Sequence, residues 1–226
     1  MNFITDTIDE IVEQQFLCVF LIDATGSMVE EKLLESINIG LQEFKNTIVA
    51  DSYGITPYKV QVSVVAFDKE SHVVLPPTSI SVADIPILSA NGRSSLQEAI
   101  CLSGRVIDEQ KSLYKKKGIP YYRPTIYCIS DYNGFEEDEF QKILSSLEED
   151  IGKKKYSFIP VAVGEDYDAQ IVTRLSNHGI GFSVSHNSII AFFRMIALEI
   201  IERSTRNVNI GENMISIREN NGIKIL

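Results

Sequence analysis

Residues 20–28 read FLIDATGSM, the segment of the sequence most informative about the fold. It contains the end of the apolar run Phe16–Ile22 and the polar residues that follow, a carboxylate at Asp23 and hydroxyls at Thr25 and Ser27. A short run that is apolar on both faces is typical of a strand in a parallel sheet covered by helices on both sides. The stretch therefore predicts a buried strand followed by a polar loop and a helix.

Two further apolar runs have the same character, Thr125–Ile129 and Phe158–Val163. Apolar residues at helical spacing fill the stretches 32–49, 96–114, 137–147 and 188–202. Residues 58–67 alternate apolar with polar and precede 71–75 across a short turn, which predicts a hairpin. The predicted fold class is α/β, a Rossmann-like, mostly parallel central sheet with one antiparallel edge strand and helices on both faces.

The chain divides into three predicted parts. Residues 1–14 form an N-terminal segment, residues 15–204 form one domain, and residues 205–226 form a C-terminal tail. Within the tail, 214–218 and 223–226 flank a Glu-Asn-Asn-Gly turn, which favours a β-hairpin packed on the domain.

Charge and composition exclude several classes of partner. The 226 residues carry a net charge of −10, which disfavours nucleic acid and an anionic membrane surface. The apolar runs of the chain are much shorter than the roughly 20 residues that span a bilayer.

Three widely spaced cysteines, Cys18, Cys101 and Cys128, favour free thiols over disulfides or metal ligation. They also favour a reducing, cytoplasmic location.

Oxygen donors gather where the predicted strands end. Asp23, Thr25 and Ser27 follow the first strand, Asp131 follows the 125–129 strand, and Ser94 lies in the loop that opens the helix at 96. Ligands of open α/β sheets bind at the carboxyl ends of strands, and oxygen-only donors suit Mg²⁺ or Mn²⁺. For the first motif alone, helix capping by the hydroxyls is the alternative.

The order of these motifs resembles the von Willebrand factor A (vWA) domain with its metal-ion-dependent adhesion site (MIDAS), usually Asp-x-Ser-x-Ser, then Thr, then Asp. Within that group the sequence is most similar to bacterial TerY-type proteins of tellurium resistance and stress. The matching segments are IDATGSM, VSVVAFD with LPPTSI, GRSSLQEAI, YRPTIYCISD and IPVAVGED, over about Phe16 to Glu202. Carried over, the resemblance implies a metal set of Asp23, Thr25, Ser27, Ser94 and Asp131, with Ser95 as the alternative register to Ser94.

This chain also departs from the family pattern. Arg93 stands where a second Gly is common, and Tyr132 and Phe135 follow Asp131 in place of the usual Gly and Pro-Thr-Asp segment. A guanidinium and two aromatic rings beside the site are predicted to contact a protein partner.

The resemblance implies a protein-binding module rather than an enzyme. A cation at the MIDAS would capture an Asp or Glu of a protein partner, and relatives pair with a kinase or phosphatase encoded nearby in stress-response or defence systems. The alternatives are a metal-dependent phosphohydrolase or phosphotransferase of Rossmann-like fold, and a degenerate vWA scaffold without metal. The sequence sets neither the partner nor the oligomeric state.

Overall fold

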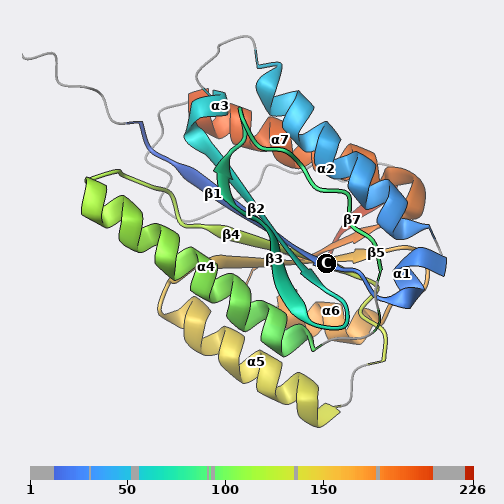
Figure 1. The fold of residues 1–226 in the computed structure, drawn as a ribbon. Coiled ribbons are helices and arrows are strands. Elements are labelled where there is room, and N and C mark those ends of the chain that lie inside the picture. Colours follow the sequence, from blue (N-terminus) through green and yellow to red (C-terminus); the bar gives the residue numbers. More distant parts are fainter. Residues whose placement is uncertain are drawn as a thin grey trace, which may run out of the picture.

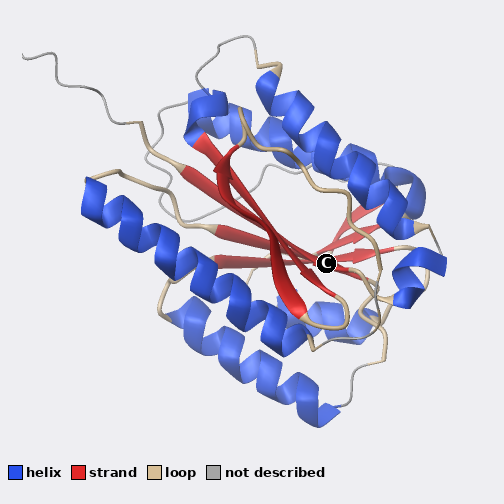
Figure 2. Cartoon of the chain, viewed as in Figure 1, coloured by secondary structure: helices blue, strands red, loops and turns tan. Residues whose placement is uncertain are grey.

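A seven-stranded sheet crosses the centre of the molecule, with helices packed on both of its faces (Figures 1 and 2). The computed structural model describes residues 13–30, 32–51, 56–90, 92, 95–134, 137–176, 179–205 and 222–226. In order across the sheet, the strands are β3 (Ser71–Ser79), β2 (Val60–Phe67), β1 (Phe16–Asp23), β4 (Thr125–Ser130), β5 (Ser157–Val163), β6 (Phe182–Val184) and β7 (Ile223–Ile225).

The five inner strands are parallel, and both edges are antiparallel. β3 pairs with β2 through the predicted hairpin, and β7 pairs with β6. The predicted fold class is confirmed, while the second antiparallel edge was not expected from the sequence. The predicted strand at 214–218 lies outside the described residues.

Side-chain alternation along β1 builds two separate cores. Phe20 and Ile22 face one apolar cluster with α2 (Leu33–Val49) and α7 (Ile189–Thr205). Val19 and Leu21 face the other, with α4 (Leu96–Lys117), α5 (Glu137–Gly152) and α6 (Ala169–Ser176). Figure 1 shows these two helical layers on opposite sides of the sheet.

Three short helical segments complete the described chain, α1 (Gly26–Glu30), α3 (Thr56–Lys59) and the 3₁₀ helix η1 (His186–Ser188). α3 takes the first two residues of the predicted 58–67 strand, because that strand pairs with β1 only from Val60 onward. α6 and β6 are additional elements that the apolar pattern did not predict.

An irregular segment, residues 80–90 (the strap), leaves β3 and runs along α2. Side chains spaced at helical intervals on α2 hold it. Asn38 Nδ2 donates to Leu88 O at 2.9 Å while Leu88 N donates back to Asn38 Oδ1 at 2.8 Å, and Lys45 Nζ donates to Ala83 O at 2.6 Å. The strap is therefore fixed although it has no regular secondary structure.

The three cysteines are free thiols, as predicted. Cys18 and Cys128 are buried, and burial raises the pKa of each to about 12, whereas Cys101 is exposed on α4. Among the described helices, none is long and apolar enough to cross a membrane.

Candidate metal site

The candidate site forms where β1 and β4 end side by side. The two strands are parallel, and their register pairs Ile22 with Ile129. Asp23, the last residue of β1, therefore lies beside Ser130, the last residue of β4, and Asp131 follows directly. Strand pairing thus brings together two motifs that are more than 100 residues apart in the sequence.

Asp23 is the buried centre of the site. The residue is 4% exposed, Thr25 N donates to Oδ1 at 2.9 Å, and Ser130 Oγ donates to Oδ2 at 2.6 Å. Burial raises the pKa of Asp23 above its ordinary value, hydrogen bonds from Ser130 and Thr25 oppose that rise, and the Asp131 carboxylate adds to it. Asp23 and Asp131 are therefore close enough to interact electrostatically.

Ser130 is a site residue that sequence reasoning missed. Its Oγ accepts a hydrogen bond from Tyr132 N at 3.0 Å while it donates to Asp23. Because the backbone N–H occupies an oxygen lone pair, the hydroxyl proton remains available for the carboxylate. The sequence signal is slight, a serine directly before the aspartate at the end of a buried strand.

Thr25 and Ser27 carry their hydroxyls on the rim of the site. Their Oγ atoms lie 3.3 Å apart, with Thr25 half-buried and Ser27 exposed in α1. The backbone turns back toward the sheet just before them, where Ala24 N donates to Phe67 O of β2 at 3.0 Å. The structure therefore groups the whole first motif, Asp23, Thr25 and Ser27, at the carboxyl edge of the sheet.

Asp131 is the second buried carboxylate. It is 4% exposed, and its Oδ1 accepts a hydrogen bond from Asn133 N at 3.1 Å. Asn133 in turn donates through Nδ2 to Asp166 O at 2.9 Å, which ties this loop to the loop that follows β5. Among the described residues, none donates a hydrogen bond to Asp131 Oδ2.

The structure describes only one of the two candidate ligands in the loop before α4. Ser94, with Arg93 and Phe135, lies outside the described residues. The alternative ligand, Ser95, precedes α4, and its hydroxyl donates to Glu139 Oε1 on α5 at 3.3 Å rather than to a member of the site.

Tyr132 is not an exposed partner contact, contrary to the sequence prediction. Its φ of 55° lies in the left-handed region and its side chain is fully buried. The hydroxyl donates to Cys128 O on β4 at 2.6 Å. In this structure the ring is part of the core beneath the site.

The donor set fits a hard divalent cation. It offers two carboxylates, Asp23 and Asp131, and neutral hydroxyls from Thr25 and Ser27, and Mg²⁺ is commonly held by one or two carboxylates together with water. The described residues include no cluster of three or more His, Cys, Asp or Glu side chains that could hold a metal. A site of this kind contains only two such groups, because hydroxyls supply its other protein donors.

Comparison with known proteins identifies the fold. A scan of protein-family models and a search of curated proteins found no match. Solved structures do match, among them a von Willebrand factor type A protein from Catenulispora acidiphila, with 16% identity and a TM-score of 0.61 over 84% of this chain. The chain spans 43% of that protein.

Two pilus proteins match in the same way. The von Willebrand factor domain of the type V pili tip protein Mfa5 from Porphyromonas gingivalis has 12% identity and a TM-score of 0.60, over 90% of this chain and 99% of that one. The open conformation of the pilus adhesin SpaC from Lactobacillus rhamnosus GG has 13% identity and a TM-score of 0.63, over 86% of this chain and 31% of that one. The chain has the fold of a von Willebrand factor A domain.

Proposed function

We propose that this protein is a cation-dependent protein-binding module. The observation that carries the proposal is the meeting of two buried carboxylates, from the ends of β1 and β4, with two rim hydroxyls at the carboxyl edge of the sheet. Asp23, Thr25, Ser27 and Asp131 would hold Mg²⁺ or Mn²⁺, with Ser94 as the fifth protein ligand.

The cation would supply a Lewis-acidic centre that attracts an Asp or Glu side chain of a partner. The residues of the chain determine when this attraction operates. Without a cation, the two buried carboxyl groups of Asp23 and Asp131 offer no positive charge to an incoming carboxylate, and any negative charge that they carry repels it. Ser130 and Thr25 hold the Asp23 carboxylate in place by hydrogen bonds to its two oxygens. Partner binding is therefore switched on by metal.

Binding rather than catalysis is the proposed activity. The fold neighbours include a pilus adhesin and a pilus tip protein, which supports a role in protein contact. Against phosphoryl transfer, Thr25 stands where phosphohydrolases of Rossmann-like fold usually carry an acidic general acid. The resemblance to TerY-type proteins supports a bacterial stress-response or defence setting in the cytoplasm, with a kinase or phosphatase as partner.

A peptide selection tests this proposal without a known partner. A random heptapeptide phage library is panned on immobilised protein in Mg²⁺, and bound phage are eluted with a chelator. Peptides from the native protein should be enriched in Asp or Glu, and Asp131→Asn should abolish this enrichment. Asp166→Asn is the matched control, because it removes one negative charge from an exposed residue in a neighbouring loop. Equal enrichment on all three proteins would refute the proposal.

A further inference from the structure

The residue that follows Asp131 has an unusual backbone conformation. Tyr132 has a φ of 55°, in the left-handed region. A residue with a Cβ there costs roughly 1–2 kcal/mol, whereas glycine adopts this conformation freely. Two other non-glycine residues of the described chain have a positive φ, Lys32 and Lys154, and both are exposed next to helix ends. Tyr132 differs from them because it is fully buried and directly follows a predicted metal ligand.

Both the side chain and the backbone of Tyr132 are held against β4. The ring packs in the apolar cluster that the sheet forms with α4, α5 and α6, and its hydroxyl donates to Cys128 O at 2.6 Å. The backbone N–H donates to Ser130 Oγ at 3.0 Å. We call these contacts of Tyr132 the tyrosine brace. Because they close back on β4 at two points, residues 128–132 form one fixed unit.

The tyrosine brace encloses groups of the candidate metal site. Asp131 lies between Ser130 and Tyr132, so its backbone is fixed on both sides. Ser130 in turn donates to Asp23 Oδ2 at 2.6 Å, which connects the brace to the other carboxyl group. Tyr132 therefore supports both carboxyl groups of the site, Asp23 through Ser130 and Asp131 through the adjoining peptide bond.

Fixing this turn favours cation binding for an entropic reason. A glycine at position 132 would adopt the same φ without strain, but it would leave the chain after Asp131 without its anchor. Fixing the backbone of one residue costs about 1–2 kcal/mol of conformational entropy. Because the tyrosine brace fixes the turn on folding, cation binding does not have to order it. Strained backbone that the surrounding structure holds in place is typical of binding sites.

We propose that Tyr132 is a positioning residue of the candidate metal site. The tyrosine brace holds Asp131, and through Ser130 also Asp23, in place before a cation is bound. This inference rests on the proposed function, and it adds to the site a residue that acts only through its neighbours.

Two substitutions at Tyr132 separate its parts. Tyr132→Gly removes the ring and its hydroxyl and tolerates the positive φ, whereas Tyr132→Phe keeps the ring and loses only the hydroxyl. Affinity for Mn²⁺ is measured by electron paramagnetic resonance, from the signal of the free ion. Outer groups that orient metal ligands change metal affinity by about 10–100-fold, so we expect Tyr132→Gly to bind Mn²⁺ about tenfold more weakly than the native protein. Tyr132→Phe should restore nearly native affinity.

Tyr156→Ala is the matched control. Tyr156 is 1% exposed in the same apolar cluster, but it directly precedes β5, at the end of the parallel strands opposite the candidate site. Its loss opens a cavity of the same kind without touching the site, so the affinity for Mn²⁺ should stay native. Urea unfolding establishes the conditions under which each variant is folded. Equal affinities of the native protein and Tyr132→Gly, or an equal loss in Tyr156→Ala, would overturn the inference.

Hydrogen exchange of the native protein tests the inference even if Tyr132→Gly does not fold. Exchange of the Tyr132 amide is followed by NMR in a chelator and in Mg²⁺. It should be as slow as that of the β4 amides under both conditions, because the tyrosine brace exists without metal. Fast exchange in the chelator would show that the turn is not fixed before metal binds and would overturn the inference.

Failure of this inference differs from failure of the proposed function. If the native protein binds Mn²⁺ and Tyr132→Gly binds it equally well, only the positioning role of Tyr132 is refuted. If the native protein binds no Mn²⁺, with or without acetate, the proposed function fails and the positioning role fails with it.

Discussion

Replacing Ser130 by alanine should destabilise the metal-free protein far more than an ordinary buried serine does. The change removes a 2.6 Å hydrogen bond to the Asp23 carboxylate and leaves Tyr132 N, which donated to Ser130 Oγ at 3.0 Å, without its acceptor. A hydrogen bond to a charged group contributes about 1.5–3 kcal/mol, and an unsatisfied buried N–H costs about 1–3 kcal/mol. Allowing for partial relaxation, we expect a loss of about 2–4 kcal/mol in the free energy of unfolding.

The chain offers a matched control on β2, which is separated from β4 by β1. Ser63 is as fully buried as Ser130, but its Oγ donates to the uncharged Leu75 carbonyl at 2.8 Å. Ser63→Ala should cost about 1 kcal/mol. Both variants are unfolded with urea at neutral pH in a chelator and followed by circular dichroism. Equal losses for the two variants would show that Ser130 does not support the Asp23 charge.

Three further predictions concern the rest of the fold. Burial raises the pKa of Tyr114 from 10.0 to about 12. Its neutral form therefore stabilises the fold below about pH 10, and this stability is lost as the pH rises through 12. Phenolate absorbance of the native protein should accordingly appear at a higher pH than that of urea-unfolded protein. A thiol reagent should label Cys101 quickly and the two buried cysteines only on unfolding; three equally fast thiols would contradict this. Gly40→Ala should lower the free energy of unfolding by about 1–3 kcal/mol, although alanine has the better helix propensity, because a methyl group at this position overlaps the Phe193 ring. Urea unfolding that shows no loss of stability would refute this packing.

The first motif was predictable because its signals are local. The apolar run Phe16–Ile22 and the alternate polar residues after it specify a buried strand and its loop without reference to the rest of the chain. The structure indeed groups Asp23, Thr25 and Ser27. Their role in metal binding stays a prediction.

The roles of Ser130 and Tyr132 could not be predicted, for different physical reasons. Ser130 reaches Asp23 only because β1 and β4 pair in one particular register. The register between two strands that are distant in sequence cannot be predicted from either strand alone. Tyr132 follows a strand end, where an aromatic residue is expected to be exposed. Its left-handed backbone instead places the ring in the core, and a positive φ at a non-glycine residue is uncommon.

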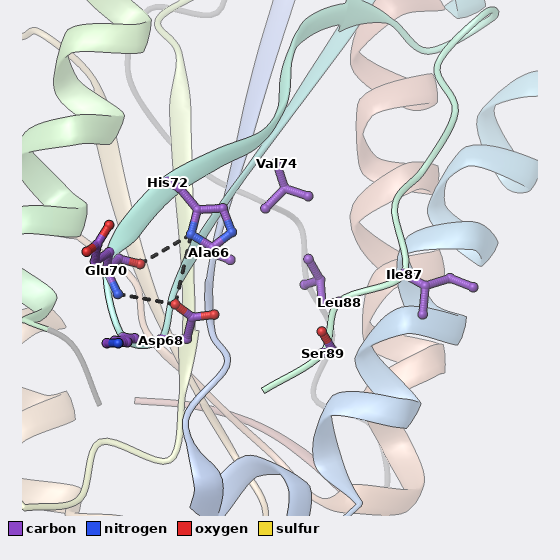
Figure 3. A pocket seen from close by; sticks show the side chains of 9 residues that line it. Ala66, Asp68, Glu70, His72, Val74, Ile87, Leu88 and Ser89 are labelled. Carbon is purple, nitrogen blue, oxygen red and sulfur yellow. Dashed lines mark hydrogen bonds and ion pairs between the residues drawn. The ribbon is translucent and has the colours of Figure 1, made fainter. Parts of the chain in front are cut away.

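The short edge elements escaped prediction because they carry little pattern. β6 and β7 have three residues each, too few to show alternation. Both depend on pairing for their strand conformation, β6 with β5 and β7 with β6. A hollow of about 590 Å³ beside the β2–β3 hairpin is a similar case, since residues of the strap line it together with residues of β2 and β3 (Figure 3).

Titration calorimetry of metal-stripped protein with Mg²⁺ and Mn²⁺ tests whether the candidate site binds a divalent cation. We expect saturable binding at one site that is lost in Asp23→Asn and Asp131→Asn and retained in Asp166→Asn. The titration is repeated with excess acetate, which supplies the carboxylate that a partner would contribute. Absence of binding under both conditions, or equal binding by all variants, would contradict metal binding at Asp23 and Asp131 and favour a vWA scaffold that works without metal.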